Sequence, residues 1–260
     1  MEPRQKWVES RGHRIRYLTL GDGPVVVLLH GFTQSADSWV GAGVVDLLAE
    51  HRRVIAIDRL GHGGSDAPIV AGAHDEQHSI DDIGAVLRAE AVDRAVFWGY
   101  SLGARSAMSY AIHDPEQVTG LIQGSAPPFD HDAFGRFADA VDGLLAAQGV
   151  EALYRSLGET DPAVVADAVE SNNADALRAC LAGSRGASPN PERVPSPWLY
   201  YYGASERPGP SDSDLARATR HGAVHVLDGA GHLDCFNRGA RDVADFVIPF
   251  LDGLSGDVSG

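Results

Sequence analysis

The chain is poor in cysteine and in long hydrophobic runs, and each shortage excludes a class of protein. Only Cys180 and Cys235 occur among 260 residues. They lie far apart without metal-ligand spacing, which argues against a disulfide framework and a zinc site. No apolar run approaches the roughly 20 residues of a membrane helix, and residues 1–6 lack a signal-peptide core. We expect free thiols, no membrane partner and a cytoplasmic location.

Basic residues are also scarce. Lysine and arginine together number 21 against 36 aspartates and glutamates, which gives a formal net charge of −15. A field of this sign repels polyanions, so general affinity for nucleic acid or for anionic membranes is not expected. The acidic residues are spread along the chain and indicate a solvated surface. The expected partner is a small-molecule substrate, and the sequence leaves the oligomeric state open.

The order of strand and helix signals predicts an α/β protein. A hairpin is expected over residues 8–20, and strand and helix patterns then alternate, which favours a mostly parallel sheet with helices on both faces. With 260 residues, of which 44% are hydrophobic, one such domain can bury a substantial core. Expected strands lie near 25–30, 53–58, 95–100, 118–124, 197–203 and 223–228, and expected helices near 36–49, 79–90, 102–113, 211–221 and 237–252.

The alternation stops between two proline-rich sites, Pro127-Pro128 and Pro189-Asn190-Pro191. The intervening segment has helical patterning at 133–147, 150–157, 162–171 and 174–182. We interpret residues 129–191 as a helical cap inserted into a core made of residues 1–128 and 192–260. In the alternative interpretation, the same helices simply pack on the core. A cap of this kind controls which substrate enters a site.

Residues 99–103, Gly-Tyr-Ser-Leu-Gly, carry the first chemical signal. They form a G-x-S-x-G pattern that follows an apolar strand signal and opens a helix signal. A serine on such a sharp turn needs small residues two positions before and after it, and Gly99 and Gly103 meet that need. Ser101 is therefore a candidate nucleophile.

Three further motifs appear in a characteristic order. A buried-strand run ends in His30-Gly31-Phe32, the strand at 53–58 opens into Gly61-His62-Gly63, and the last strand is followed by Gly229-Ala230-Gly231-His232. Together with the serine motif, they resemble the α/β-hydrolase superfamily over nearly the whole chain. The resemblance implies an α/β-hydrolase fold with a mostly parallel eight-stranded sheet, helices on both faces and a small helical cap.

Ser101 needs a base, since an alcohol is a poor nucleophile near neutral pH. His232 occupies the position that the family uses for this histidine. The third member should be a carboxylate that orients the imidazole. The family often carries Gly-x-x-Asp after the penultimate strand, and here Glu206 takes the acidic position in residues 203–206. Three alternatives to Glu206 are kept open, Asp212, Asp214 and the more remote Asp130, although either Asp212 or Asp214 could serve instead as a helix N-cap.

The family resemblance also indicates an oxyanion hole. The backbone amides of Phe32 and of Leu102, directly after the nucleophile, would stabilise the negative oxygen of a tetrahedral intermediate. His30 would shape the oxyanion loop and His62 would belong to the turn after Asp58, so both are interpreted as structural.

Residues 99–105 resemble the elbow of the menaquinone-pathway lyase branch of the superfamily. In that branch an arginine and a tyrosine help to bind an acidic substrate, which makes Arg105 and Tyr100 candidate substrate-binding residues. An arginine one turn after the nucleophile could pair with a substrate carboxylate. The alternative role for Arg105 is a salt bridge to a carboxylate of a nearby helix.

The leading functional hypothesis is hydrolysis of a small carboxylic ester or lactone through an acyl-enzyme, without cofactor or metal. A lyase or carbon–carbon hydrolase acting on an acidic substrate with the same triad is the alternative, and a ligand receptor is a remote one. Haloalkane dehalogenases and epoxide hydrolases resemble this fold but use an aspartate at the elbow, where this chain has Ser101.

Overall fold

The computed structural model describes residues 2–126, 133–185, 189–194, 197–206 and 210–255. Its centre is an eight-stranded sheet in the order β1-β2-β4-β3-β5-β6-β7-β8. The first two strands pair antiparallel to their neighbours and the other six are parallel, as predicted. The strands are β1 Arg4–Ser10, β2 His13–Leu20, β3 Val25–Leu29, β4 Arg53–Ile57, β5 Ala95–Tyr100, β6 Val118–Gly124, β7 Trp198–Gly203 and β8 Gly222–Leu227.

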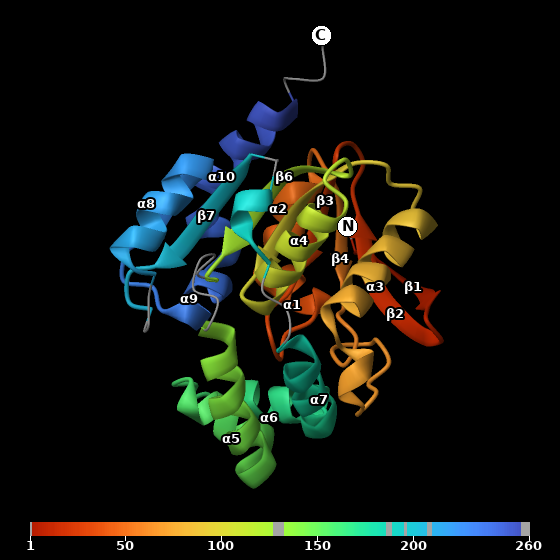
Figure 1. Cartoon of the computed structure of the whole chain (residues 1–260), viewed down its shortest axis with the longest axis vertical. Coiled ribbons are helices and arrows are strands. Elements are labelled where there is room, and N and C mark those ends of the chain that lie inside the picture. The colour runs from red at the N-terminus through yellow and green to blue at the C-terminus, as the bar shows by residue number, and fades with distance from the viewer. Residues whose placement is uncertain (1, 127–132, 186–188, 195–196, 207–209, 256–260) are drawn as a thin grey trace.

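Helices cover both faces of this sheet (Figure 1). They are α1 Ala36–Gly41, α2 Val44–Ala49, α3 Glu76–Ala89, α4 Leu102–His113, α5 Ala133–Ser156, α6 Pro162–Ser171, α7 Ala174–Ser184, α8 Asp212–His221, α9 His232–Asn237 and α10 Gly239–Ser255. Two short 3-10 helices, η1 Ala71–Ala73 and η2 Pro191–Arg193, lie in loops.

The core has two layers because side chains of a strand alternate between the sheet faces. On β5, Phe97 belongs to the cluster under α3, α4 and α8, whereas Trp98 belongs to the cluster under α1, α2, α9 and α10. Both side chains are fully buried. Strands buried on both faces read as continuous apolar runs, which is why the sequence showed them clearly.

Two predicted helices were wrong in detail. The expected helix at 36–49 is divided into α1 and α2 at Gly43, whose φ of +73° interrupts the helical backbone. The expected helix at 237–252 is preceded by a separate short helix, α9, and α10 begins only at Gly239, where φ is +48°. A side chain at Gly239 would lie 2.3 Å from the carbonyl oxygen of Ala42. Both breaks depend on glycine conformation, which hydrophobic periodicity does not register.

Helices α5, α6 and α7, called here the helical insertion, lie between β6 and β7 in the chain and beside the sheet in the lower part of Figure 1. The break predicted after residue 147 is a kink in α5 at Gly149, with φ of +75°. The insertion has its own apolar cluster, which also includes Phe32 and Leu102 of the core. The predicted boundary after residue 128 lies outside the described residues, and the cap assignment stays a prediction.

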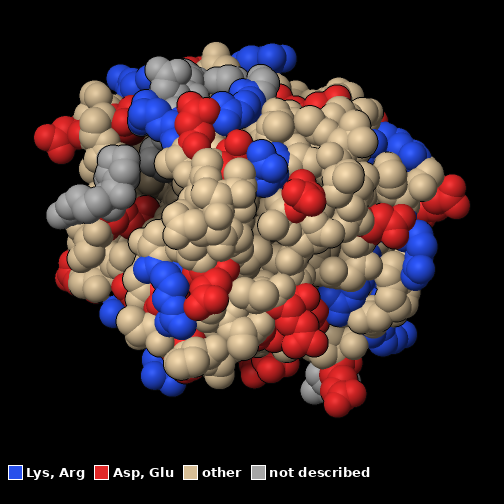
Figure 2. Space-filling view, turned by 90° about the horizontal axis from the view of Figure 1, so that it is seen from below, with Lys and Arg blue, Asp and Glu red and all other residues tan. Residues whose placement is uncertain are grey.

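Figure 2 shows the face that carries the helical insertion. Acidic and basic side chains are interspersed there within a larger uncharged area, and no broad basic patch is seen. None of the described helices combines the length and the apolar character that a transmembrane segment requires.

Candidate active site

The candidate nucleophile occupies a strained turn. Ser101 joins β5 to α4 with φ of +52° and ψ of −114°, a conformation that residues other than glycine rarely adopt. Its amide donates to the Gly124 carbonyl at 2.8 Å. A side chain at Gly99 would lie 2.3 Å from the Gly103 carbonyl oxygen, and one at Gly103 would lie 2.1 Å from that of Leu29. The two glycines are therefore required by close backbone packing.

His232 is the first residue of α9 and faces the nucleophile. Its Nε2 lies 3.1 Å from Oγ of Ser101. The hydroxyl of Tyr100 donates to the backbone carbonyl of His232, and the two rings are 5.6 Å apart. Tyr100 is nearly fully buried. A side chain predicted to bind substrate thus also fixes the backbone of the candidate base.

Glu206 lies just after β7 and is the carboxylate next to this imidazole. Its Oε2 is 3.6 Å from Nδ1 of His232, a contact slightly longer than a hydrogen bond. Its Oε1 accepts from Oγ of Ser125 at 2.6 Å and from the Gly203 amide at 2.9 Å. Burial acts to raise the pKa of Glu206, but His232, Ser125 and the Gly203 amide outweigh it and lower that pKa. The carboxylate is therefore held in its charged form.

The alternative carboxylates that the structure describes lie at the start of α8 and do not contact His232. Asp214 forms a capping box with Ser211 at the start of α8, accepting from the Ser211 hydroxyl at 2.6 Å. Asp212 is in the first turn of the same helix. Neither makes an ion pair with His232 among the described residues, and Asp130 lies outside them. Of the weighed carboxylates that the structure describes, Glu206 alone contacts the candidate base.

Two backbone amides are available near Ser101. The Leu102 amide begins α4, where the first amides of a helix have no partner within it. No described acceptor receives a hydrogen bond from the amide of Leu102 or of Phe32. The Phe32 side chain belongs to the cluster of the helical insertion, as does that of Leu102.

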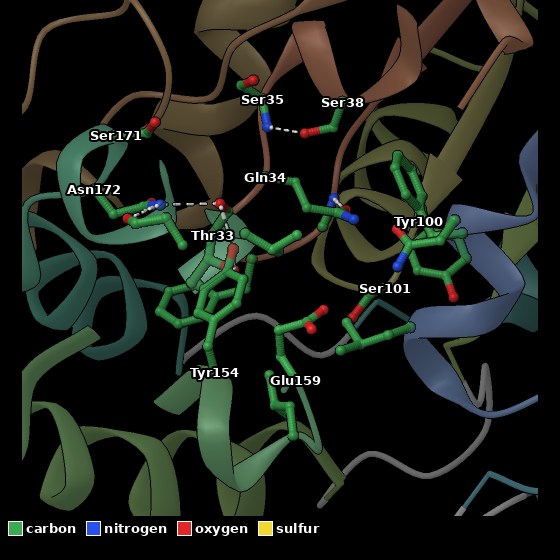
Figure 3. Close-up of a pocket in the computed structure, with 18 of the residues that line it drawn as sticks. Thr33, Gln34, Ser35, Ser38, Tyr100, Ser101, Tyr154, Glu159, Ser171 and Asn172 are labelled. Atoms are coloured by element: carbon green, nitrogen blue, oxygen red, sulfur yellow. Dashed lines mark hydrogen bonds between the residues drawn. The ribbon is translucent and has the colours of Figure 1, made fainter. Parts of the chain in front are cut away.

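A cavity of about 700 Å³ lies between the helical insertion and the core, with Ser101 in its wall (Figure 3). His232 also lines this cavity. Its apolar wall includes Phe32, Phe137, Leu153, Leu157, Val164, Leu233 and Phe236. Its polar wall includes Thr33, Gln34, Tyr154, Asn172 and the carboxylates Asp37, Glu159 and Asp167. Among the described lining residues there is no lysine or arginine.

Arg105 is on α4 but outside that described lining. Its guanidinium lies over the ring of Phe134 on α5, with Cζ 4.4 Å from the ring centroid. Burial lowers the pKa of Arg105 to about 10, and the charge of nearby Arg59 acts in the same direction. A role for Arg105 in substrate binding stays a prediction, and its observed contact joins the core to the helical insertion.

His30 and His62 are both buried, in keeping with structural roles. Nδ1 of His30 donates to the Gly31 carbonyl at 2.7 Å, and its Nε2 accepts from the Arg59 amide at 3.0 Å. This pattern corresponds to a neutral imidazole, and burial lowers the pKa of each ring. The rings of His30 and His62 pack at 5.3 Å.

Sequence analysis missed Ser125 and Thr33. Ser125 follows β6 with φ of +50° and holds Glu206, and Thr33 in the loop after His30 has φ of +65°. Neither belongs to a chemical motif, because their partners are 81 and 139 positions away. The one available signal for Ser125 was its place at the carboxyl end of a predicted parallel strand. Among the described residues, no cluster of three or more His, Cys, Asp or Glu is arranged for a metal ion.

Comparisons with known proteins agree with this architecture. A family model described as the α/β hydrolase fold matches residues 24–146. Epoxide hydrolase VrEH1 from Vigna radiata has a similar structure, with a TM-score of 0.78 over 97% of this chain and 99% of that one. The sequence identity is 20%, so this similarity concerns the fold alone.

Two curated relatives share sequence with this chain. A putative 2-succinyl-6-hydroxy-2,4-cyclohexadiene-1-carboxylate synthase of Bacillus subtilis is 35% identical over 118 residues, 44% of this chain and 42% of the relative. The bifunctional esterase/perhydrolase DCH of Acinetobacter calcoaceticus is 35% identical over 109 residues, 41% of this chain and 38% of the relative. The chain thus spans less than half the length of these relatives. Together, the sheet topology, the structural similarity and the family-model match over residues 24–146 show that the chain has an α/β-hydrolase fold.

Proposed function

We propose that the protein is a serine hydrolase that cleaves small, uncharged carboxylic esters or lactones. The 3.1 Å contact between Ser101 Oγ and His232 Nε2 carries the proposal. The charged, buried Glu206 beside Nδ1 supports it, because a carboxylate there favours the tautomer whose Nε2 can accept a proton.

The reaction proceeds in two halves. Ser101 Oγ attacks the ester carbonyl carbon while its proton passes to His232 Nε2, and the resulting oxyanion accepts from the Phe32 and Leu102 amides. Collapse breaks the bond to the alcohol oxygen, which takes the proton from His232. A water then attacks the acyl-enzyme, gives a proton to His232, and releases the carboxylic acid as Ser101 regains its proton.

The chemistry of the cavity supports an uncharged substrate. Carboxylates are present in the described lining, whereas lysine and arginine side chains are not. An anionic substrate would lose hydration there without gaining a cationic partner. The apolar wall formed by the helical insertion offers contacts to an acyl chain, and we propose that this insertion acts as a cap over the site.

This chain shares its fold with the epoxide hydrolases, but a shared fold does not imply a shared reaction. If a carboxylate opens an epoxide, the covalent intermediate is an ester, which water can hydrolyse. If Ser101 did so, the intermediate would be an ether, and the enzyme would be blocked after one event. The serine at the elbow therefore favours acyl transfer.

A second candidate is a lyase or carbon–carbon hydrolase acting on an acidic substrate. The similarity to the Bacillus subtilis synthase favours it. This hypothesis requires Arg105 to reach a substrate carboxylate. Arg105→Ala would then selectively lower activity on carboxylate-bearing substrates, whereas loss of the Phe134 contact alone would affect neutral and anionic substrates alike.

The test is steady-state hydrolysis of 4-nitrophenyl esters of increasing acyl length and of simple lactones, comparing the wild type with Ser101→Ala. We expect multiple turnovers that disappear in the variant. Circular dichroism of both proteins is the control for folding. Absence of turnover by folded wild-type protein on every ester and lactone would refute the proposal.

A further inference from the structure

Thr33 occupies the least favourable backbone conformation in the loop next to Ser101. Its φ is +65°, in the left-handed region, which a β-branched residue seldom adopts. Thr33 is the third residue of a turn in which the Gln34 amide donates to the Gly31 carbonyl at 3.2 Å. A positive φ at this position of a turn normally selects glycine or asparagine. Something outside the turn must therefore hold Thr33 in place.

The helical insertion supplies that support. From α5, the Tyr154 hydroxyl lies 3.2 Å from Oγ1 and 3.4 Å from the carbonyl oxygen of Thr33, so it can donate to either. Just after α6, Nδ2 of Asn172 donates to the same carbonyl at 3.2 Å and to that of Ala168 at 2.9 Å. Figure 3 shows Thr33 between these two side chains, with Gln34 on the side toward Ser101.

The same turn fixes one candidate oxyanion donor. The Gly31 carbonyl accepts from His30 Nδ1 and from the Gln34 amide, and the Gly31 amide donates to Gln34 Oε1 at 2.8 Å. The two bonds to the Gly31 carbonyl set the plane of the peptide between Gly31 and Phe32. In a trans peptide the amide of Phe32 points opposite to that carbonyl. A side chain built on Gly31 would lie 3.3 Å from Cβ of Ser101, so the plane stands directly beside the nucleophile.

We propose that Tyr154 and Asn172 are positioning residues that hold Thr33 in its left-handed conformation and so keep the Phe32 amide aimed at the reacting oxygen. This inference rests on the proposed ester hydrolysis and adds a role for the helical insertion in catalysis itself. The turn at residues 31–34 does not by itself favour the left-handed conformation of Thr33. Packing of the helical insertion against this turn therefore completes the oxyanion hole.

Tyr154→Phe and Asn172→Ala test the role by removing the donors. Asn173→Ala is the matched control, since Asn173 is adjacent and caps α7 through the Asp175 and Ala176 amides without contacting Thr33. We expect each of the first two variants to lower kcat by about tenfold with a smaller change in KM, because a misplaced oxyanion donor affects the transition state most. The control should retain kcat within about twofold, the margin that loss of a remote cap allows.

A Thr33→Gly background separates positioning from substrate contact. Glycine adopts a positive φ at no steric cost, so the turn no longer needs the insertion to hold it. The kcat losses from Tyr154→Phe and Asn172→Ala should therefore shrink to about twofold or less in that background. Equal losses in both backgrounds, or losses confined to KM, would overturn the inference.

A second readout keeps this result separate from the proposed function. Ser101 attack on a 4-nitrophenyl phosphonate forms the Oγ–P bond while the Oγ proton passes to His232 Nε2 and 4-nitrophenolate is expelled. Negative charge develops on the phosphoryl oxygen during this step, and no turnover is needed. If no ester is hydrolysed but phosphonate labelling slows in the two variants and recovers with Thr33→Gly, the proposed function fails and the positioning role stands. If labelling occurs and both variants label as fast as the wild type, the positioning role is rejected. If no protein is labelled, exchange of the residue 31–34 amides decides. Faster exchange in Asn172→Ala than in Asn173→Ala then supports the role, and equal exchange rejects it.

Discussion

The hydroxyl of Ser125 donates to Oε1 of Glu206 at 2.6 Å, inside the protein and at the carboxyl end of β6. Both side chains are nearly fully buried, and Ser125 has φ of +50°. The candidate triad thus includes a supporting contact from a neighbouring strand. The relationship explains how a glutamate, with one methylene more than aspartate, is held in one orientation beside His232.

Removing this hydroxyl should weaken catalysis and change the pH dependence of stability. The folded-state pKa of Glu206 is lowered, so the carboxylate adds stability above its unfolded pKa of about 4.3 and loses it as pH falls through the folded pKa. Without the Ser125 donor the folded pKa rises toward the unfolded value, so in Ser125→Ala the loss should be smaller and should be complete at higher pH than in the wild type. The free energy of unfolding in urea, measured at several pH values between about 3 and 7 that bracket the unfolded pKa of glutamate, checks this prediction.

Ser125→Gly is the companion variant for that experiment. It removes the same hydroxyl but relieves the positive φ, so it should be more stable than Ser125→Ala by about 1 kcal/mol. Both variants should show a similar fall in kcat. If kcat instead follows stability across the pair, Ser125 has only a structural role.

The strained elbow predicts a conflict between stability and activity at Ser101. Ser101→Gly should be more stable than Ser101→Ala by about 1 kcal/mol, because glycine tolerates the φ of +52°. Both variants should lose esterase activity by about 10³-fold or more. Thermal unfolding and 4-nitrophenyl ester hydrolysis measure the two effects, and equal stabilities would argue against strain at this position.

The two elbow glycines should resist substitution. Gly99→Ala and Gly103→Ala place Cβ 2.3 Å and 2.1 Å from backbone oxygens, so each should destabilise the fold by about 3 kcal/mol or more. Gly143→Ala on α5 meets open space and should be neutral or stabilising by up to about 1 kcal/mol. The urea midpoints of the three variants measure these changes in stability. A Gly103→Ala variant nearly as stable as the wild type would contradict the prediction.

The cavity should discriminate against anionic esters. Ethyl levulinate and monoethyl succinate are similar in size but differ by one negative charge, and we expect kcat/KM to be about tenfold or more higher for the neutral ester, because the anion gains no partner on entering. Val164 lines the cavity, so Val164→Arg would offer the anion a cationic partner and should lower the ratio of kcat/KM for the neutral ester to that for the anionic ester. Val169→Arg is its control, since Val169 is similarly exposed on α6 and is not among the lining residues. A comparable change in both variants would point to general surface charge instead.

Local sequence patterns were sufficient to predict the sheet, the elbow and the order of the candidate triad. Buried parallel strands leave continuous apolar runs, and the turn at Ser101 leaves a local glycine pattern, so both can be detected within a few residues. The positions of Ser101 and His232 along the chain followed from the same motifs, whereas Glu206 was one of several carboxylates that the sequence left open. The helix breaks at Gly43 and Gly239 were missed because they depend on backbone conformation and close packing.

The contacts between distant segments, in contrast, depend on how the chain folds in three dimensions. Glu206 rather than Asp212 or Asp214 contacts His232 because the loop after β7 folds toward α9, whereas those aspartates start α8. The Arg105 guanidinium lies over the Phe134 ring, a contact that no local pattern predicted. Thr33 is held by Asn172 from 139 positions away. Such contacts join segments without any shared local pattern, so their partners and geometry are set only when the helical insertion packs against the core.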